Sequence, residues 1–167
     1  LSRTTRDPRL AKRATEIALH AGNPYAAEQA ATIWIELEPD SADARQTIAA
    51  LLINLGKLDA AKPHLEKLLS SEKDNVGGAF MQLNQLLSRN PNKLEALQLI
   101  QQLSQPYKDL PEVHFATSQA AWFANQHQLA LDEMQRALAL RPDWEIAAIH
   151  NGRILQRTSN AEASDYY

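Results

Sequence analysis

The sequence contains no cysteine, and only five of its 167 residues are glycine. The lack of cysteine excludes disulfides, thiolate metal sites and cysteine nucleophiles, but it leaves the redox compartment open, because such a chain suits cytosol and periplasm equally. The longest apolar run, residues 48–53, is far shorter than the roughly 20 residues that a transmembrane helix needs. The chain begins with Leu1 rather than methionine, so we expect a further segment upstream, and the lack of a signal peptide does not restrict the location.

An excess of charge of one sign is also lacking. The formal net charge is −3 and the pI is near 6.0, whereas a nucleic-acid-binding protein usually has a basic face. Basic residues gather only near the start of the chain, at Arg3, Arg6, Arg9, Lys12 and Arg13. A solvated helix face is the simpler interpretation of this cluster, so no nucleic-acid partner is expected. With 44% hydrophobic and 22% charged residues, the composition is typical of a globular protein that is long enough to bury a core.

What the sequence does contain is an internal repeat. Four alanines, Ala27, Ala61, Ala96 and Ala130, follow one another at spacings of 34, 35 and 34 residues. Gly22 and Gly56 are also 34 residues apart. A fixed period of this length is typical of stacked helical repeats.

Each repeat has the pattern helix, tight turn, helix. In the second repeat the apolar spacing predicts helices over residues 44–55 and 58–69, interrupted at Gly56, since a glycine after a helix adopts the left-handed conformation without a Cβ clash. Asn125 takes the place of this glycine in the fourth repeat. No segment alternates with a period of two over a useful length, so we expect no strands.

Helices this short are marginally stable alone in water, so the hairpins must stack on one another. The repeated alanines then allow close approach of neighbouring helices, with Ala49, Ser118 and Gly152 in the equivalent role on the first helices. We predict one domain over residues 1–167, with the following repeats: 8–41, 42–76, 77–110, 111–144 and a partial repeat at 145–167.

The period, the small residues and the proline that follows the second helix of a repeat together resemble the tetratricopeptide repeat family. The second repeat matches best, at Ile48, Ala49, Leu52, Gly56, Ala61, Leu65 and Leu68, and the fourth matches at Asn125, Ala130, Ala137 and Pro142. The resemblance implies an all-α fold, a right-handed α-solenoid of antiparallel helix hairpins. The sequence departs from the family pattern at Trp34, at residues 90–92 and at His114 and Ala121.

The two ends of the chain resemble interrupted repeats. Residues 1–8 are similar to the tail of a preceding second helix, and residues 144–157 are predicted to be a fifth first helix. Residues 160–167 are expected to begin its partner helix. These patterns predict that the sequence is a fragment of a longer solenoid.

Residues 7–14 and 16–19 also resemble early repeats of a proteobacterial class of outer-membrane tetratricopeptide lipoproteins. Some members of that class act as adaptors for a carboxyl-terminal processing protease. The resemblance implies a lipid anchor outside this segment, a place on the periplasmic face of the outer membrane and possible contact with a periplasmic protease. A cytoplasmic location is the alternative.

In this family the first helices line the concave surface, which implies a set of partner-binding residues for a protein or peptide. That set is Arg9, Lys12, Glu16, Gln46, Asn54, Gln82, Gln85, Arg89, Phe115, Gln119, Trp122, His150 and Arg153. Amides suit hydrogen bonds to a peptide backbone, and an exposed aromatic ring beside arginine suits an anchor side chain. The alternative is that Phe115, Trp122 and Phe123 are core residues between the fourth and fifth repeats, an interpretation that we favour for Phe123.

The carboxylate clamp of chaperone-binding relatives is not expected. Its positions hold Lys12, Glu16, Thr47, Gly78 and Gln82, of which only the lysine fits, and Glu16 would repel a carboxylate.

We expect no catalytic residues, metal site or cofactor. The five histidines fall in different repeats without ligand spacing. Asp109, Glu112 and His114 could meet locally, but helix capping accounts for the two carboxylates. The sequence therefore predicts an interaction scaffold rather than an enzyme. Two alternatives stay open, an accessory module of a larger enzyme or envelope assembly and self-association through exposed apolar faces.

Overall fold

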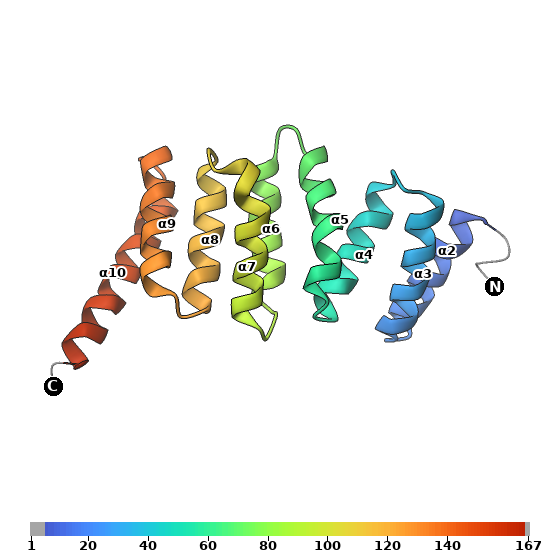
Figure 1. Cartoon of the computed structure of the whole chain (residues 1–167), viewed down its shortest axis with the longest axis horizontal. Coiled ribbons are helices and arrows are strands. Elements are labelled where there is room, and N and C mark those ends of the chain that lie inside the picture. Colours follow the sequence, from blue (N-terminus) through green and yellow to red (C-terminus); the bar gives the residue numbers. More distant parts are fainter. Residues whose placement is uncertain (1–5, 166–167) are drawn as a thin grey trace. The chain divides into compact units, whose positions relative to one another are not determined.

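The computed structural model describes residues 6–165 and separates the chain into two compact units, residues 1–73 and 74–167. The regular structure of the described residues is entirely helical, which confirms the predicted all-α class (Figure 1). The prediction that residues 1–167 make a single domain stays a prediction. The tail-like pattern of residues 1–8 falls mostly outside the described part, which also excludes Arg3.

Unit 1 consists of two antiparallel hairpins. Its helices are α2 (Pro8–His20), α3 (Pro24–Leu37), α4 (Ala42–Asn54) and α5 (Leu58–Ser71). Helix α3 packs against α2 within its hairpin and against α4 of the next. Asp7, Asn23 and Ser41 precede the first three helices, and each side chain accepts a hydrogen bond from a backbone N–H of the first turn.

The turns of unit 1 have the predicted conformation. Gly22 and Gly56 have φ angles of +65° and +73°, the left-handed region in which a Cβ atom would be strained. In each turn the residue after the glycine donates its N–H back to the helix, from Asn23 to the Ala18 carbonyl and from Lys57 to Leu52. Glycine therefore ends the first helix of both hairpins.

Trp34, a departure from the family pattern, lies in the core of unit 1. Its ring packs with Ala11 and Ala44, and 4% of the residue is exposed. The indole Nε1 donates to Glu38 Oε2 at 2.8 Å. Because the facing residues are alanines, the large ring fits where the family prefers a small side chain.

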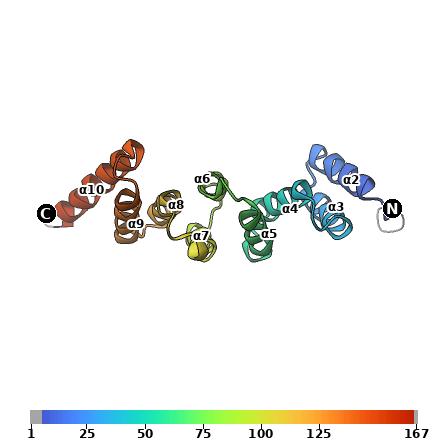
Figure 2. The same ribbon diagram turned by 90° about the horizontal axis from the view of Figure 1, so that it is seen from above.

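Unit 2 contains the remaining helices. They are α6 (Val76–Leu87), α7 (Lys93–Ser104), the 3-10 helix η1 (Gln105–Tyr107), α8 (Pro111–Phe123), α9 (His127–Leu140) and α10 (Glu145–Asp165). Helices α6, α7 and α9 all contact α8, and α10 packs on α9. Within this unit α6, α8 and α10 lie on one side and α7 and α9 on the other (Figure 2).

The two turns of unit 2 are built differently. Asn125 has a φ angle of +58°, which confirms that it replaces the turn glycine. Between α6 and α7 the side chain of buried Asn90 accepts a hydrogen bond from the Asn92 N–H at 2.8 Å. The turn of the third repeat is therefore stabilised by an asparagine side chain instead of containing a left-handed residue.

Small residues stand where α8 and α9 cross. The Ser118 hydroxyl donates to the Ala130 carbonyl at 2.5 Å, and neither residue is exposed. Ala27 on α3 and Ala61 on α5 are likewise fully buried, and so is Ala137 further along α9. Ser118 and the buried alanines confirm that the repeated small residues mark close helix contacts. Gly152 is a correction to that prediction, because it is exposed and a Cβ atom added there would meet no atom within 4 Å, so no neighbouring helix requires a small residue at this position.

The predicted break near the end of the chain is wrong. Helix α10 continues from Glu145 to Asp165 without a turn, although residues 160–167 were expected to start a second helix. The physical reason is that neither glycine nor proline follows Arg157, and the Thr158 hydroxyl is satisfied by the Ile154 carbonyl within the helix.

Candidate protein-binding site

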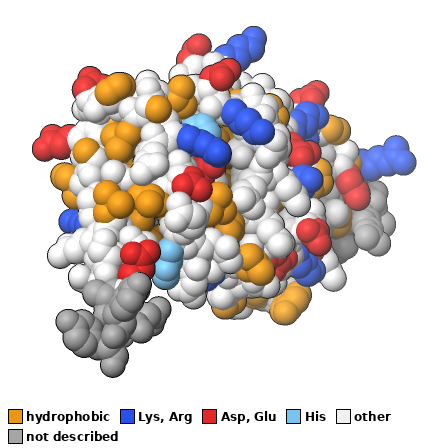
Figure 3. All heavy atoms as spheres, turned by 60° about the vertical axis from the view of Figure 1, so that its left-hand side comes forward, with side chains coloured by type: hydrophobic (Ala, Val, Ile, Leu, Met, Phe, Trp, Pro, Cys, Tyr) orange, Lys and Arg blue, Asp and Glu red, His pale blue; other side chains and the backbone are white. Residues whose placement is uncertain are grey.

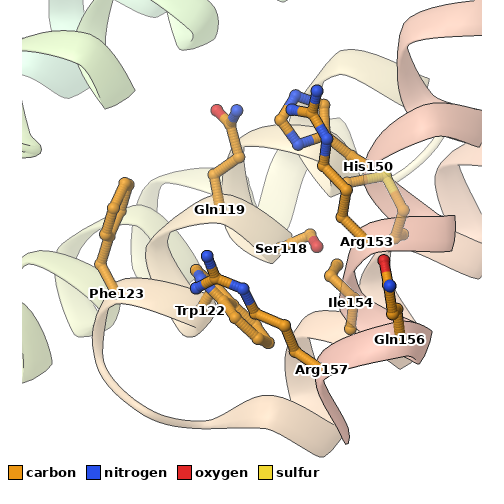
Figure 4. A pocket seen from close by; sticks show the side chains of 10 residues that line it. Ser118, Gln119, Trp122, Phe123, His150, Arg153, Ile154, Gln156 and Arg157 are labelled. Atoms are coloured by element: carbon orange, nitrogen blue, oxygen red, sulfur yellow. The ribbon is translucent and has the colours of Figure 1, made fainter. Parts of the chain in front are cut away.

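A cavity of about 430 Å³ opens between α8 and α10 in unit 2 (Figure 4). Its lining combines apolar, amide and basic side chains. The lining residues are Ser118, Gln119, Trp122, Phe123, Met134, His150, Arg153, Ile154, Gln156 and Arg157. Four of the predicted groove residues, Gln119, Trp122, His150 and Arg153, are thus brought together at one place.

Trp122 forms an aromatic wall of this cavity. The guanidinium of Arg157 lies 5.7 Å from the ring centroid, and the two side chains lie together in Figure 4. The imidazole of His127 lies on the ring at a centroid distance of 4.7 Å. Trp122 is partly buried, so it is both held by its neighbours and open to the cavity.

His150 and Arg153 lie at the opposite wall. Burial lowers the pKa of His150 below its ordinary value of 6.5, and the positive charge of Arg153 lowers it further. Both effects favour the neutral imidazole, which offers one N–H donor and one acceptor.

Phe115 is a correction to the predicted site. Only 2% of the residue is exposed, because its ring is enclosed by Trp144 at a centroid distance of 4.8 Å and by His150 at 5.2 Å. Phe115 therefore packs against His150 and is not accessible to a partner.

Phe123 is a correction in the opposite direction. It was interpreted as core, but it is 50% exposed and lies at the rim of the cavity. Lys93 Nζ is 5.9 Å from the centre of its ring. An aromatic side chain with one covered and one open face is suited to contact with a partner.

Gln119 has a defined hydrogen-bond partner. The Nδ2 atom of buried Asn84 donates to Gln119 Oε1 at 2.7 Å, which joins α6 to α8. With its oxygen engaged, the Gln119 amide nitrogen is left as a donor toward the cavity. In Figure 4 the side chain stands clear of the helix between Phe123 and Arg153.

The predicted residues of α6 and of the turn after it do not line this cavity. Gln82, Gln85 and Arg89 are exposed, and α6 lies on the same side of unit 2 as α8 and α10 (Figure 2). They extend the polar surface beyond the cavity, and their role in binding stays a prediction.

The predicted residues of unit 1 are exposed but partly engaged. Arg9 forms an ion pair with Asp7 at 3.1 Å, which lowers the pKa of that carboxyl through the hydrogen bonds that Arg9 donates. Lys12 Nζ lies 5.5 Å from the Trp34 ring centre. The others, Glu16, Gln46 and Asn54, are exposed on α2 and α4. As a binding surface this set also stays a prediction.

The sequence reasoning missed a buried polar contact on the other side of α8. His114 Nε2 donates to the Lys108 carbonyl at 2.7 Å, and its Nδ1 lies 2.6 Å from Glu133 Oε2. Glu112, which was considered a local partner of His114, instead pairs with Arg141.

A signal for this contact was present in the repeat itself. His114 and Glu133 are 19 residues apart, and so are Arg45 and His64, whose side chains also meet, at 3.3 Å. Arg45 and burial both lower the pKa of His64, with burial the larger cause. The same two repeat positions thus carry a polar pair in the second and the fourth hairpin.

Two further findings concern the described residues only. Residues 6–165 contain no group of three or more histidine or acidic side chains able to hold a metal ion. None of the helices in that range combines the length and the apolar character needed to cross a membrane.

Comparison with known proteins identifies the repeat. The family described as Tetratricopeptide repeat matches residues 42–75, which contain the hairpin of α4 and α5. These residues match a tetratricopeptide repeat. Across 70 residues the chain is also 31% identical to the tetratricopeptide-repeat-containing protein PA4667 of Pseudomonas aeruginosa. That match spans 42% of the chain but only 12% of the relative.

Solved structures with the same helical fold cover most of the chain. MamA of Desulfovibrio magneticus RS-1 superimposes with a TM-score of 0.53 at 18% identity, over 95% of this chain and 89% of MamA. YrrB, described as a tetratricopeptide protein with an unusual peptide-binding site, gives 0.51 at 15% identity, over 89% of this chain and 76% of YrrB. Tetratricopeptide proteins generally mediate protein–protein interactions and are typically scaffolds without catalytic activity.

Proposed function

We propose that this chain is a scaffold that binds an extended segment of another protein on the α6, α8 and α10 side of unit 2. The observation that carries the proposal is the cavity between α8 and α10, where Trp122, Gln119 and Arg153 converge. A cavity with apolar walls and a few oriented polar groups is typical of a binding site. The peptide-binding site named for YrrB makes a peptide a reasonable form of partner.

The groups around the cavity suit a peptide more than a small metabolite. Glutamine side chains on α6 and α8 can bond with backbone N–H and C=O groups of an extended chain. Trp122 and the exposed Phe123 offer rings against which an apolar side chain can pack. An aromatic anchor flanked by amides combines affinity with tolerance of peptide sequence.

The test is a selection of displayed peptides against the immobilised whole chain, followed by calorimetry with each enriched peptide. Trp122→Ala should weaken binding by at least about tenfold, because truncation of a buried aromatic anchor commonly costs 2 kcal/mol or more. Tyr25→Ala is the matched control, since Tyr25 is an exposed aromatic residue of unit 1. Equal affinity of the Trp122 variant and the parent chain would contradict the proposal.

A second proposal concerns the cellular location and the longer protein to which the chain belongs. The matched part covers 12% of the Pseudomonas relative, so a repeat segment like this one occurs there within a much longer protein. We propose, from the sequence resemblance of residues 7–19, that the chain belongs to an envelope lipoprotein that acts as an adaptor for a processing protease. Fractionation of cells that express the complete reading frame tests the location. Recovery in the cytosol alone would contradict it and would leave the accessory-module alternative.

A further inference from the structure

The cavity between α8 and α10 has a lining rich in hydrogen-bond donors. Arg153 and Arg157 contribute guanidinium groups from successive turns of α10, and Gln119 contributes the amide nitrogen that Asn84 leaves free. Among the described residues that line the cavity, none carries a carboxylate. The lining therefore contains no negatively charged group to neutralise the two arginines.

Other arginines of unit 2 do have carboxylate partners. Arg141 pairs with Glu112, and Arg136 pairs with Glu133. Among the side chains that the structure describes, neither Arg153 nor Arg157 forms an ion pair. The two arginines at the cavity thus differ from their neighbours, which have partners in the chain itself.

Both arginines are held near the cavity. The guanidinium of Arg157 is placed over the Trp122 ring, which fixes its plane and leaves its N–H groups free at the edges (Figure 4). Arg153 is close enough to His150 to lower the pKa of that imidazole, so its charge is felt within the site. Because the groups are already positioned, an anionic ligand would order few additional side chains.

We propose that this cavity receives the carboxylate of an aspartate or glutamate side chain from an extended partner segment. Arg153 and Arg157 hold the carboxylate, and an apolar neighbour on the same segment packs against Trp122 and Phe123. This inference rests on the proposed function, because it specifies the partner of that same site. Arginine suits the task since its planar donors match the two oxygens of a carboxylate.

An internal segment fits the surroundings better than a chain terminus. Exposed amides continue on both sides of the cavity, with Gln82 and Gln85 on α6 and Asn160 on α10. A segment that passes through the cavity therefore finds hydrogen-bond partners before and after it. Figure 3 shows hydrophobic and charged side chains mixed over one face of the molecule. On α10, Ile146 and Ile149 are exposed apolar residues close to His150 in sequence.

The experiment uses the whole chain and two libraries of random peptides. In the first library each peptide is displayed within a loop and has no free carboxyl terminus. In the second library each peptide has a free carboxyl terminus. Enriched loop peptides are then synthesised with both ends capped and measured by calorimetry. We expect an acidic residue beside an aromatic or aliphatic one to recur in the loop library.

The decisive comparison changes the peptide and the protein separately. Replacement of the recurrent Glu by Gln in the peptide should weaken binding by at least about tenfold, and so should the double change Arg153→Ala with Arg157→Ala. The two effects should not add, because they remove one interaction. Lys67→Ala with Lys73→Ala removes the same charge from exposed positions of unit 1 and should leave the affinity unchanged.

The outcomes separate this inference from the function on which it rests. If binding depends on Trp122 but not on the peptide's carboxylate or on the two arginines, the acidic partner is wrong and the scaffold function stands. If only the library with free termini is enriched, the site binds a terminal carboxylate and the proposed internal segment is overturned. If no peptide is enriched, or if neither Trp122→Ala nor Gln119→Ala weakens any of them, both proposals fail.

Discussion

The Nδ1 atom of His114 lies 2.6 Å from Oε2 of Glu133, and this contact joins α8 to α9 in the interior of unit 2. The other ring nitrogen donates to the Lys108 carbonyl, so two acceptors face the imidazole. Without Glu133, the Nδ1 atom of buried His114 is left without its hydrogen-bond partner.

The first prediction concerns this contact. Glu133→Ala should lower the free energy of unfolding by roughly 3 kcal/mol, because it removes one partner of a buried pair. Glu133→Gln should cost much less, since its amide can donate to an unprotonated Nδ1. Urea denaturation followed by helical circular dichroism measures both. Gln128→Ala, an exposed change on the same helix, serves as the control, and equal effects of the Ala and Gln variants at position 133 would contradict the account.

The second prediction concerns the repeated alanines. Ala61 is fully buried on α5, and its neighbour Ala60 is exposed. Ala61→Leu should lower the free energy of unfolding by about 1–3 kcal/mol, because the added atoms force α4 and α5 apart. Ala60→Leu adds the same atoms on the solvent side and should change it little. Thermal melts of the two variants test the difference, and a similar loss for both would show that helix separation is not the cause.

The third prediction concerns glycine. Gly56 has a φ angle of +73°, so Gly56→Ala should cost roughly 1–2 kcal/mol in backbone strain. Gly152 lies within α10, and a Cβ atom added there meets no atom within 4 Å. Gly152→Ala should therefore raise the free energy of unfolding by about 0.5–1 kcal/mol. Opposite shifts of the melting temperature are expected, and shifts of the same sign would contradict the assignment.

The fold could be predicted from the sequence because its determinants are local and repeat. Glycine at 56 and asparagine at 125 end helices by their own backbone preference, and the alanines recur once in each hairpin. The continuation of α10 was missed because Ser159 and Asn160 look like a turn while nothing in the chain forces one.

The site was harder to predict because exposure depends on neighbours distant in sequence. Phe115 and Trp122 lie on the same helix with similar composition around them, yet Trp144 and His150 enclose only Phe115. Arg157 was not among the predicted site residues, because its position over Trp122 follows from the packing of α10.

The fourth prediction concerns pH. His150 has a pKa below 6.5 in the folded chain because of burial and, second, because of Arg153. An unfolded imidazole titrates near its ordinary value, so below about pH 6.5 the unfolded state binds more protons. The contribution of His150 to stability is thus complete above that pH and is lost as the pH falls toward the folded pKa.

Nuclear magnetic resonance titration of the His150 ring checks this directly. Its midpoint should lie below the ordinary value of 6.5. Arg153→Ala should raise the midpoint without restoring it fully, because burial is the larger cause. A midpoint at or above 6.5 in the parent chain would contradict the arrangement.

The most direct test of the central claim, that the α8 and α10 side of unit 2 binds a partner segment, is the response of the three tryptophan indoles to a selected peptide. In a ¹H–¹⁵N correlation spectrum each indole N–H gives its own signal. The account predicts that the Trp122 signal shifts on titration in proportion to occupancy, while buried Trp34 of unit 1 does not respond. A peptide that binds and leaves the Trp122 signal in place would contradict the claim.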